Sequence, residues 1–233
     1  MPVTCYTPPM TRFDAVLFDL DGTLLDSVPL ILSSYRHVFT EHGLPPRTDA
    51  EVLAGLGTPL EAMFERWVDD PALVQTLADA YIEHNLAVHD GLVRPFPGVS
   101  ELVRDLHVAG IPMAIVTSKR RRGTEMGLAA LGLADCFSVV VTADDVSRPK
   151  PDPEPVQQAL EALGVPAASA VFVGDATHDV HAGRAAEVVT IAVTWGAASE
   201  AQLVESGPTH LVRDVGALRG ILLPSVPSLP DIK

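Results

Sequence analysis

Short runs of apolar residues recur along the chain and predict β-strands. The first run, Phe13–Phe18 (FDAVLF), ends directly before an acidic segment. Four similar runs and a weaker fifth follow it, at Ile111–Val116, Phe137–Val141, Ala170–Val173, Val188–Val193 and Thr209–Val212. Because these runs are short and rich in β-branched residues, they favour strands over helices.

Apolar residues with helical spacing lie between these runs. Two such faces consist of Val99, Leu102, Val103 and Leu106, and of Val156, Ala159, Leu160 and Leu163. A chain in which strands alternate with helices forms a parallel sheet that is covered on both sides. We therefore predict an α/β fold with a doubly wound parallel sheet.

One long segment after the first strand shows helical patterns alone. Helices are predicted over Ile31–His42 and Leu73–His84. Shorter helices are predicted within Ala50–Val68, on either side of a turn at Gly55–Pro59. No strand pattern interrupts this segment, so it is predicted to be all-helical.

These patterns divide the chain into two predicted domains. The core domain comprises residues 12–27 and 93–223, and residues 28–92 form a helical cap domain that is inserted into it. Residues 1–11 and 224–233 are predicted to be loose tails.

The charge of the chain argues against polyanionic partners. It has 30 Asp and Glu against 16 Lys and Arg, which gives a net charge of −14. Since an acidic surface repels nucleic acids and anionic membranes, we expect neither as a partner. The one run of positive charges, Lys119–Arg122, is interpreted as the solvated start of a helix.

The cysteines and the hydropathy pattern indicate a cytoplasmic location. Cys5 and Cys136 are too few for a disulfide framework, so we expect both to be reduced. No apolar run reaches the roughly 18 residues of a membrane-spanning helix, and the first residues lack the pattern of a secretory signal. A monomer or a homodimer is expected.

Two aspartates follow the first predicted strand. Asp19 and Asp21 are two residues apart, so in an extended chain both point to the same side. One carboxylate of such a pair can act as a nucleophile while the other holds a proton. Gly22 allows a ligand to approach the backbone closely, although an Asp-Gly pair is also typical of an ordinary turn.

A second acidic group follows the strand predicted at 170–173. Gly174 and Asp175 come directly after this strand, and Asp179 lies one helical turn further on. The two carboxylates would offer the oxygen ligands that a hard cation such as Mg²⁺ prefers. The alternative is that they only cap the start of a helix.

Two further segments suit a phosphate. Thr117 and Ser118 follow a predicted strand, where hydroxyls and free backbone N–H groups bind phosphate or simply cap a helix. Lys150 lies between two prolines in a chain with only three lysines, and it is either a phosphate ligand or an exposed turn residue.

The four segments together point to one site, because ligands bind at the carboxyl ends of strands in open α/β sheets. Ionised Asp19, Asp175 and Asp179 would carry three negative charges, which Mg²⁺ and Lys150 would balance. A phosphate dianion could then enter the site despite the acidity of the chain.

In this order, the segments resemble the four motifs of the haloacid dehalogenase superfamily of phosphohydrolases. The matching residues are Asp19-Leu20-Asp21-Gly22-Thr23-Leu24-Leu25-Asp26-Ser27, Thr117 or Ser118, Lys150, and Gly174-Asp175 with Asp179. The resemblance spans roughly residues 12–215, and a small helical cap after the first motif is typical of that superfamily. The chain is most similar in appearance to its phosphoglycolate phosphatase and pyrophosphatase group, which Thr194-Trp195-Gly196 also resembles.

The resemblance implies a Mg²⁺-dependent phosphatase that works through an aspartyl-phosphate. It implies that Asp19 attacks phosphorus and that Asp21 protonates the leaving oxygen and later deprotonates water. Mg²⁺ would be held by Asp19, the Asp21 carbonyl and Asp175, with Asp179 in support. Thr117, Ser118 and Lys150 would hold the phosphoryl group of a small metabolite such as phosphoglycolate, pyrophosphate or a sugar phosphate.

Other functions within this fold stay open. A phosphomutase of the β-phosphoglucomutase type shares the motifs, although mutases tend toward valine at the position of Thr23. A non-catalytic phosphate-binding regulatory protein is a more distant alternative, since no acid or lysine of the motifs is missing. A dehalogenase would lack Asp21.

Substrate selection is expected in the cap. The turn that contains Gly57 and Thr58 is predicted to face the core and contact the substrate. Arg47 or Arg66 could bind a second phosphate or a carboxylate. Only 5% of the residues are aromatic, which favours a small substrate over a stacked nucleobase.

Overall fold

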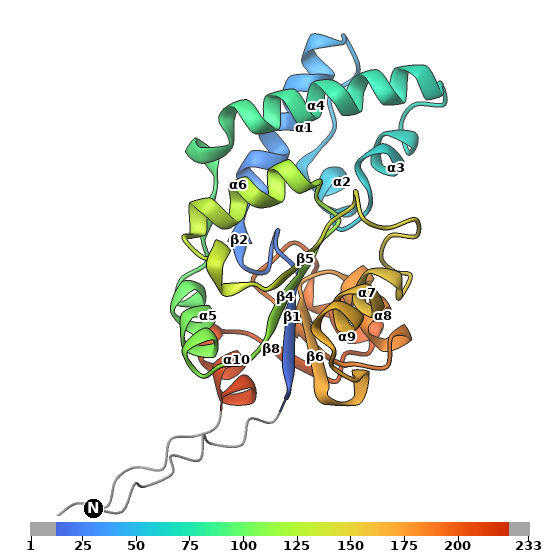
Figure 1. Cartoon of the computed structure of the whole chain (residues 1–233). Helices are drawn as coiled ribbons and strands as arrows, with labels where there is room; N and C mark the ends of the chain where they lie inside the picture. Colours follow the sequence, from blue (N-terminus) through green and yellow to red (C-terminus); the bar gives the residue numbers. More distant parts are fainter. Residues whose placement is uncertain (1–12, 224–233) are drawn as a thin grey trace, which may run out of the picture.

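A six-stranded sheet runs through the core of the protein, as a computed structural model of residues 13–223 shows (Figure 1). Its strands lie in the order β5-β4-β1-β6-β7-β8, and all neighbours are parallel. They are β1 (Ala15–Phe18), β4 (Met113–Val116), β5 (Val139–Val141), β6 (Ala170–Gly174), β7 (Val189–Val193) and β8 (His210–Val212). All six predicted strands are confirmed. The predicted tails and Cys5 lie outside the described residues.

The sheet is covered on both sides because successive residues of β1 point in opposite directions. Val16 and Phe18 lie in one buried cluster, with residues of α5 (Val99–Val108), α6 (Arg121–Leu131) and α10 (Val215–Leu222). Ala15 and Leu17 lie in another, with residues of α7 (Glu154–Leu163) and α8 (Thr177–Ala185). In Figure 1, α5 and α10 accordingly lie on one side of the sheet and α7 and α8 on the other. The predicted doubly wound α/β fold is thus confirmed.

Three short helices complete the core. Helix α9 (Glu200–Ser206) packs through Leu203 against Val180 of α8 and Ala192 of β7. Two 3₁₀ turns, η1 (Ala134–Cys136) and η2 (Ala167–Ser169), precede β5 and β6. Within residues 13–223, none of the helices combines the length and the apolarity that crossing a membrane requires.

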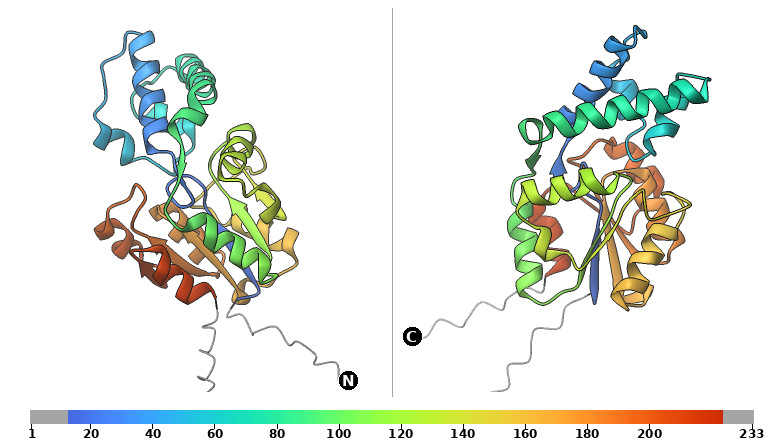
Figure 2. Two further views of the ribbon diagram at one scale, coloured as in Figure 1. Left: turned by 90° about the vertical axis from the view of Figure 1, so that its left-hand side faces the viewer. Right: turned by 45° about the horizontal axis from the view of Figure 1, so that its top comes forward.

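Four helices lie together beyond the carboxyl ends of the strands (Figures 1 and 2), and we call them the cap. They are α1 (Val28–Glu41), α2 (Asp49–Leu53), α3 (Leu60–Glu65) and α4 (Pro71–Leu92). Tyr35 and Phe39 of α1 pack with Phe64 of α3 and Leu77 of α4 in a separate hydrophobic cluster. The cap therefore has its own small core.

A two-stranded ribbon joins the cap to the sheet. Strand β2 (Leu25–Asp26) pairs antiparallel with β3 (Arg94–Pro95), so the chain enters and leaves the cap side by side. The sequence did not predict this ribbon, because two residues are too few to show a period.

The pairing register brings three strand ends to one edge of the sheet. Phe18 at the end of β1 pairs with Ile115 of β4 and with Val173 of β6. Strand order reverses at β1, because the next strands along the chain, β4 and β5, lie on one side of β1 and the later strands β6, β7 and β8 lie on its other side. A crevice at such a reversal is the usual place for a ligand.

Candidate active site

Three buried carboxylates meet at this edge of the sheet. Asp19 follows β1, Asp175 follows β6, and Asp179 lies in the first turn of α8. One carboxylate oxygen of each residue lies within 4.8 Å of the others, and each residue is at most 6% exposed. The structure therefore brings together three of the acids that the sequence singled out.

Lys150 lies between two of these carboxylates. Its Nζ donates to Asp19 Oδ1 at 2.8 Å, to Asp179 Oδ1 at 2.6 Å and to the carbonyl oxygen of Val116 at 3.2 Å. The side chain is 2% exposed, so Lys150 is not a surface turn residue. A lysine in this position holds the Asp19 carboxylate in a fixed orientation.

The electrostatics of the group favour additional positive charge. Burial raises the pKa of Asp19 well above its ordinary value, against the opposing charge of Lys150, and the carboxylates of Asp179 and Asp175 raise it further. Burial and the neighbouring Asp179 raise the pKa of Asp175 to about 7. Burial alone would lower the pKa of Lys150, but Asp179 and Asp19 outweigh this effect and raise it. One lysine does not neutralise three carboxylates.

The oxygen donors and the missing positive charge fit Mg²⁺. Hard cations prefer carboxylate and carbonyl oxygens, and Mg²⁺ is commonly held by one or two carboxylates together with substrate phosphate. The cluster of Asp19, Asp175 and Asp179 offers such oxygens in a buried position. These three residues could hold the ion.

The raised pKa of Asp175 predicts that stabilisation by Mg²⁺ depends on pH. Folding raises this pKa from 3.8 to about 7, so the stability contributed by the protonated acid is present below about pH 4 and is lost as the pH rises through 7. Mg²⁺ needs the ionised form, so its binding should strengthen over the same range. We expect a larger rise in melting temperature with Mg²⁺ at about pH 8 than at about pH 5.5. An equal rise at both pH values in calorimetry would contradict this role of Asp175.

Asp175 is held by residues from distant parts of the chain. Thr23 Oγ1 donates to its Oδ1 at 3.0 Å, and the Ala197 amide donates to its Oδ2 at 2.9 Å. The indole N–H of Trp195 in turn donates to the carbonyl oxygen of Thr23 at 3.1 Å. The sequence did not single out the supporting role of Thr23.

Glycine is required at two places around Asp175. Gly22 has a φ of +83°, and a Cβ there would lie 2.2 Å from Asp175 Oδ2. A Cβ on Gly196 would also lie 2.2 Å from this oxygen. Any side chain at either position would displace the carboxylate.

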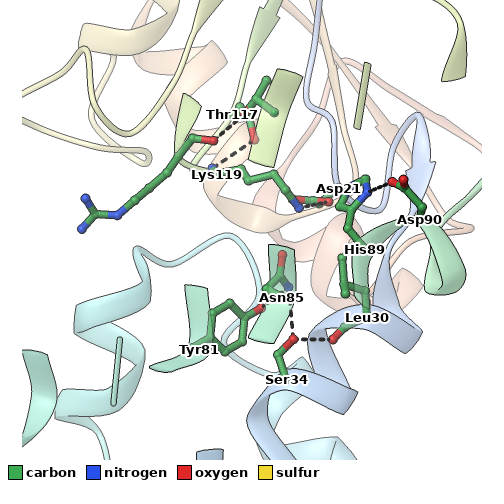
Figure 3. Close-up of polar contacts among 11 residues, drawn as sticks. Asp21, Leu30, Ser34, Tyr81, Asn85, His89, Asp90, Thr117 and Lys119 are labelled. Atoms are coloured by element: carbon green, nitrogen blue, oxygen red, sulfur yellow. Dashed lines mark hydrogen bonds and ion pairs between the residues drawn. The ribbon is translucent and has the colours of Figure 1, made fainter. Parts of the chain in front are cut away.

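Asp21 lies beside Lys119, the first cation of the run at 119–122. Lys119 Nζ contacts both carboxylate oxygens of Asp21 at 3.0 Å, and its side chain is only 12% exposed (Figure 3). Both residues line the same cavity. The interpretation of Lys119 as part of a solvated helix start is therefore wrong. Its position directly after Thr117 and Ser118 was the available signal.

Thr117 and Ser118 lie where the core meets the cap. Thr117 is 4% exposed, and its amide donates to the Val141 carbonyl oxygen at 3.0 Å. Ser118 Oγ donates to the carbonyl oxygen of Gly57 at 3.0 Å, which links the core directly to the turn between α2 and α3. The turn thus faces the core, as the sequence predicted.

A cavity of about 350 Å³ lies between the cap and the core. Its core wall contains the predicted site residues Asp19, Asp21, Gly22, Thr117, Ser118, Lys150 and Asp175, and its cap wall contains Gly57 and Thr58. The cap also contributes Tyr81 and Asn85 of α4, and Asn85 Nδ2 donates to the Tyr81 hydroxyl at 3.4 Å and to Ser34 Oγ at 3.2 Å (Figure 3). The sequence did not single out Asn85, because an isolated amide in a helix carries no pattern.

Arg47 and Arg66 do not reach this cavity. The guanidinium of Arg47 lies 5.6 Å from the Trp67 ring centroid and 5.8 Å from that of Phe39. Arg66 also lies against Trp67, at 5.8 Å. This position corrects the expectation that Arg47 meets the substrate: its side chain packs on the aromatic residues of the cap instead.

The sequence model of the haloacid dehalogenase-like hydrolase family matches residues 16–193. Pyrophosphatase PpaX of Halalkalibacterium halodurans is 39% identical over 213 residues, which cover 91% of this chain and 97% of the relative. Pyrophosphatase PpaX of Oceanobacillus iheyensis is 36% identical over 200 residues, which cover 86% of this chain and 92% of the relative.

Solved structures share the fold. A provisionally named haloacid dehalogenase-like hydrolase from Bacteroides fragilis superimposes with a TM-score of 0.83 at 25% identity, over 88% of this chain and 99% of that one. A provisionally named phosphoglycolate phosphatase from Lactobacillus plantarum superimposes with a TM-score of 0.82 at 27% identity, over 91% of this chain and 100% of that one. The similarity therefore extends over both cap and core.

Proposed function

Because this chain belongs to the haloacid dehalogenase-like hydrolase family, we propose that it is a cytoplasmic, Mg²⁺-dependent phosphatase acting on a small phosphorylated metabolite. The observation that carries the proposal is the contact of Lys150 with Asp19 inside a cluster of three buried carboxylates. This arrangement would supply a nucleophile, a cation site and a fixed positive charge within one crevice. The names of the pyrophosphatase and phosphoglycolate phosphatase relatives support a small anionic substrate.

In the first step of the proposed reaction, Asp19 is the nucleophile. One of its oxygens forms a bond to phosphorus, and the bond between phosphorus and the leaving oxygen breaks, which produces an aspartyl-phosphate. Lys150 fixes the Asp19 carboxylate through Oδ1. Thr117 and Ser118, which line the same cavity as Asp19, provide hydroxyl groups for the phosphoryl oxygens. Positioning and charge neutralisation supply most of the catalysis in phosphoryl transfer.

Asp21 is the acid and base of the proposed reaction. It gives a proton to the leaving oxygen in the first step. In the second step it takes a proton from a water molecule whose oxygen attacks phosphorus, and the bond between phosphorus and Asp19 breaks to release phosphate. With a side chain 21% exposed, Asp21 lines the cavity where the leaving group must lie.

Asp19, Asp175 and the backbone carbonyl of Asp21 would hold Mg²⁺, with Asp179 in support. When bound, the ion supplies positive charge that offsets the charges of the carboxylates and of the phosphoryl oxygens. Thr23, Ala197 and Lys150 keep the acidic side chains oriented for it.

A panel of substrates tests the proposed function. Phosphate release would be measured for phosphoglycolate, pyrophosphate, sugar phosphates and nucleotides, with Mg²⁺ and with EDTA. We expect Mg²⁺-dependent release, with one small substrate preferred by about 10²-fold in kcat/KM, or roughly 2.7 kcal/mol. Isomerisation of a sugar phosphate without phosphate release would identify a mutase instead, and no turnover of any substrate would contradict the proposal.

Replacing Asp175 with asparagine should weaken Mg²⁺ binding more than it affects the fold. The amide keeps the shape of the side chain but removes a charged ligand, so the Mg²⁺ concentration for half-maximal activity should rise at least about 10-fold. The matched control is Asp14→Asn, the same change at an exposed residue before β1. An unchanged Mg²⁺ dependence in Asp175→Asn would remove Asp175 from the metal site.

A further inference from the structure

Positive charges of an acidic chain gather at the wall of the cavity. Lys119–Arg122 form a run of four cations in a protein of net charge −14. Lys119, Arg120 and Arg122 line the cavity, directly after the end of β4. The run therefore lies at the place where a ligand of this cavity would bind.

Lys119 is the best placed of these residues to meet a ligand. Arg120 pairs with Glu61 of the cap and with Asp144, at 3.5 Å from the latter. Arg122, the third cation of the run that lines the cavity, is an exposed residue. Lys119 instead directs its Nζ at Asp21, the group that faces the leaving oxygen in the proposed reaction.

The described part of the cap offers no competing cation. Arginines and lysines that line the cavity within residues 13–223 all come from the core: Lys119, Arg120, Arg122 and Lys150. The polar side chains of the cap wall are all uncharged, those of Tyr35, Thr58, Tyr81 and Asn85, and the other side chains there are apolar. Lys150 is paired with two buried carboxylates, whereas Lys119 Nζ contacts one, that of Asp21, and Asp21 is partly exposed to the cavity. A second negative charge on the substrate therefore finds its partner in Lys119.

We propose that Lys119 binds an anionic group on the leaving side of the substrate and so determines specificity. This inference rests on the proposed function, because it places the leaving oxygen next to Asp21. Lys119 Nζ lies 3.0 Å from both Asp21 oxygens, so it reaches only groups close to that oxygen. The substrate class is therefore a short phosphate compound with a second anion within a few bonds of the scissile oxygen, such as a phosphorylated hydroxy acid or pyrophosphate.

The same contact explains how neutral leaving groups would be rejected. Lys119 binds both Asp21 oxygens, whereas Asp21 needs one of them to hold a proton at the leaving oxygen. A carboxylate or phosphate on the substrate competes for Lys119 and releases an Asp21 oxygen for that contact. A neutral alcohol cannot compete for Lys119, so the contact between Lys119 and Asp21 persists and the ester reacts slowly.

Two esters of similar size test this role. Phosphoglycolate and 2-hydroxyethyl phosphate both carry a phosphate ester on a CH2 group. They differ at the next carbon, which is a carboxylate in the first compound and an uncharged CH2OH group in the second. We expect the wild type to prefer phosphoglycolate by about 10- to 100-fold in kcat/KM, the effect of one charge-assisted hydrogen bond. Lys119→Met should remove most of this preference in two ways. It should raise KM for phosphoglycolate, and it should raise kcat/KM for the neutral ester, because Asp21 is no longer held by the lysine.

Two further variants separate charge from packing. Lys119→Arg keeps the positive charge and should restore most of the preference. Arg148→Met removes a cation from a side chain that is 68% exposed, and it should leave kcat/KM unchanged for both esters. A Lys119→Met enzyme that loses activity equally on both esters, or a wild type without a preference, would overturn the role of Lys119 and leave the phosphatase intact. A wild type that hydrolyses no phosphate compound would overturn the proposed function, and this inference with it.

Discussion

Replacing Asp19 with asparagine is expected to lower kcat by about 10³-fold or more, because an amide oxygen is a far poorer nucleophile than a carboxylate. The change preserves the shape of the side chain at the end of β1. Lys150 keeps its contacts with Asp179 and Val116, so the fold should persist. Turnover is measured by phosphate release, and the fold by circular dichroism and thermal melting.

The control for this prediction is Asp14→Asn, which makes the same chemical change at an exposed position before the same strand. It should retain wild-type turnover. Substantial turnover by Asp19→Asn, with a melting curve like that of the wild type, would remove Asp19 as the nucleophile.

Replacing Lys150 with methionine should have the largest effect on stability. Methionine has similar length but leaves the carboxylates of Asp19 and Asp179 buried without their cation. Removal of one partner from a buried ion pair destabilises a protein by about 3–5 kcal/mol. We expect this decrease in the free energy of unfolding from urea titration in the absence of divalent cations.

Mg²⁺ should restore part of the stability of Lys150→Met, because the ion would neutralise the same carboxylates. The matched control is Arg148→Met, which removes a cation from an exposed ion pair and should change the free energy of unfolding by less than about 1 kcal/mol. An unfolding curve of Lys150→Met that equals that of the control would show that Lys150 does not stabilise the buried carboxylates.

The sheet was predictable from the sequence because its strands are buried on both faces. Ala15–Phe18 is apolar throughout for this reason, and so is Met113–Val116. The meeting of Asp19 and Asp175 followed from the parallel strands, whose carboxyl ends share one edge. The ribbon Leu25–Asp26 was not predictable, since its pairing depends on a partner far along the chain.

The parts of the site that were missed depend on tertiary contacts. Thr23 supports Asp175 across a separation of 152 residues, and no local pattern reveals this contact. Lys119 was missed because a run of four cations normally lies in solvent. Here the chain leaves the end of β4 so that Lys119 lines the cavity. Arg47 was misplaced because the apolar pattern of the cap does not show that Trp67 lies beside it.

If Asp19 carries the phosphoryl group during turnover, acid quenching should trap it on this residue. Wild-type enzyme would be mixed with phosphoglycolate and Mg²⁺, quenched in acid during turnover, digested and analysed by mass spectrometry. We expect one additional phosphoryl group on the peptide that contains Asp19, and none in Asp19→Asn treated in the same way. A phosphoryl group on another residue, or the same label in Asp19→Asn, would contradict this role of Asp19.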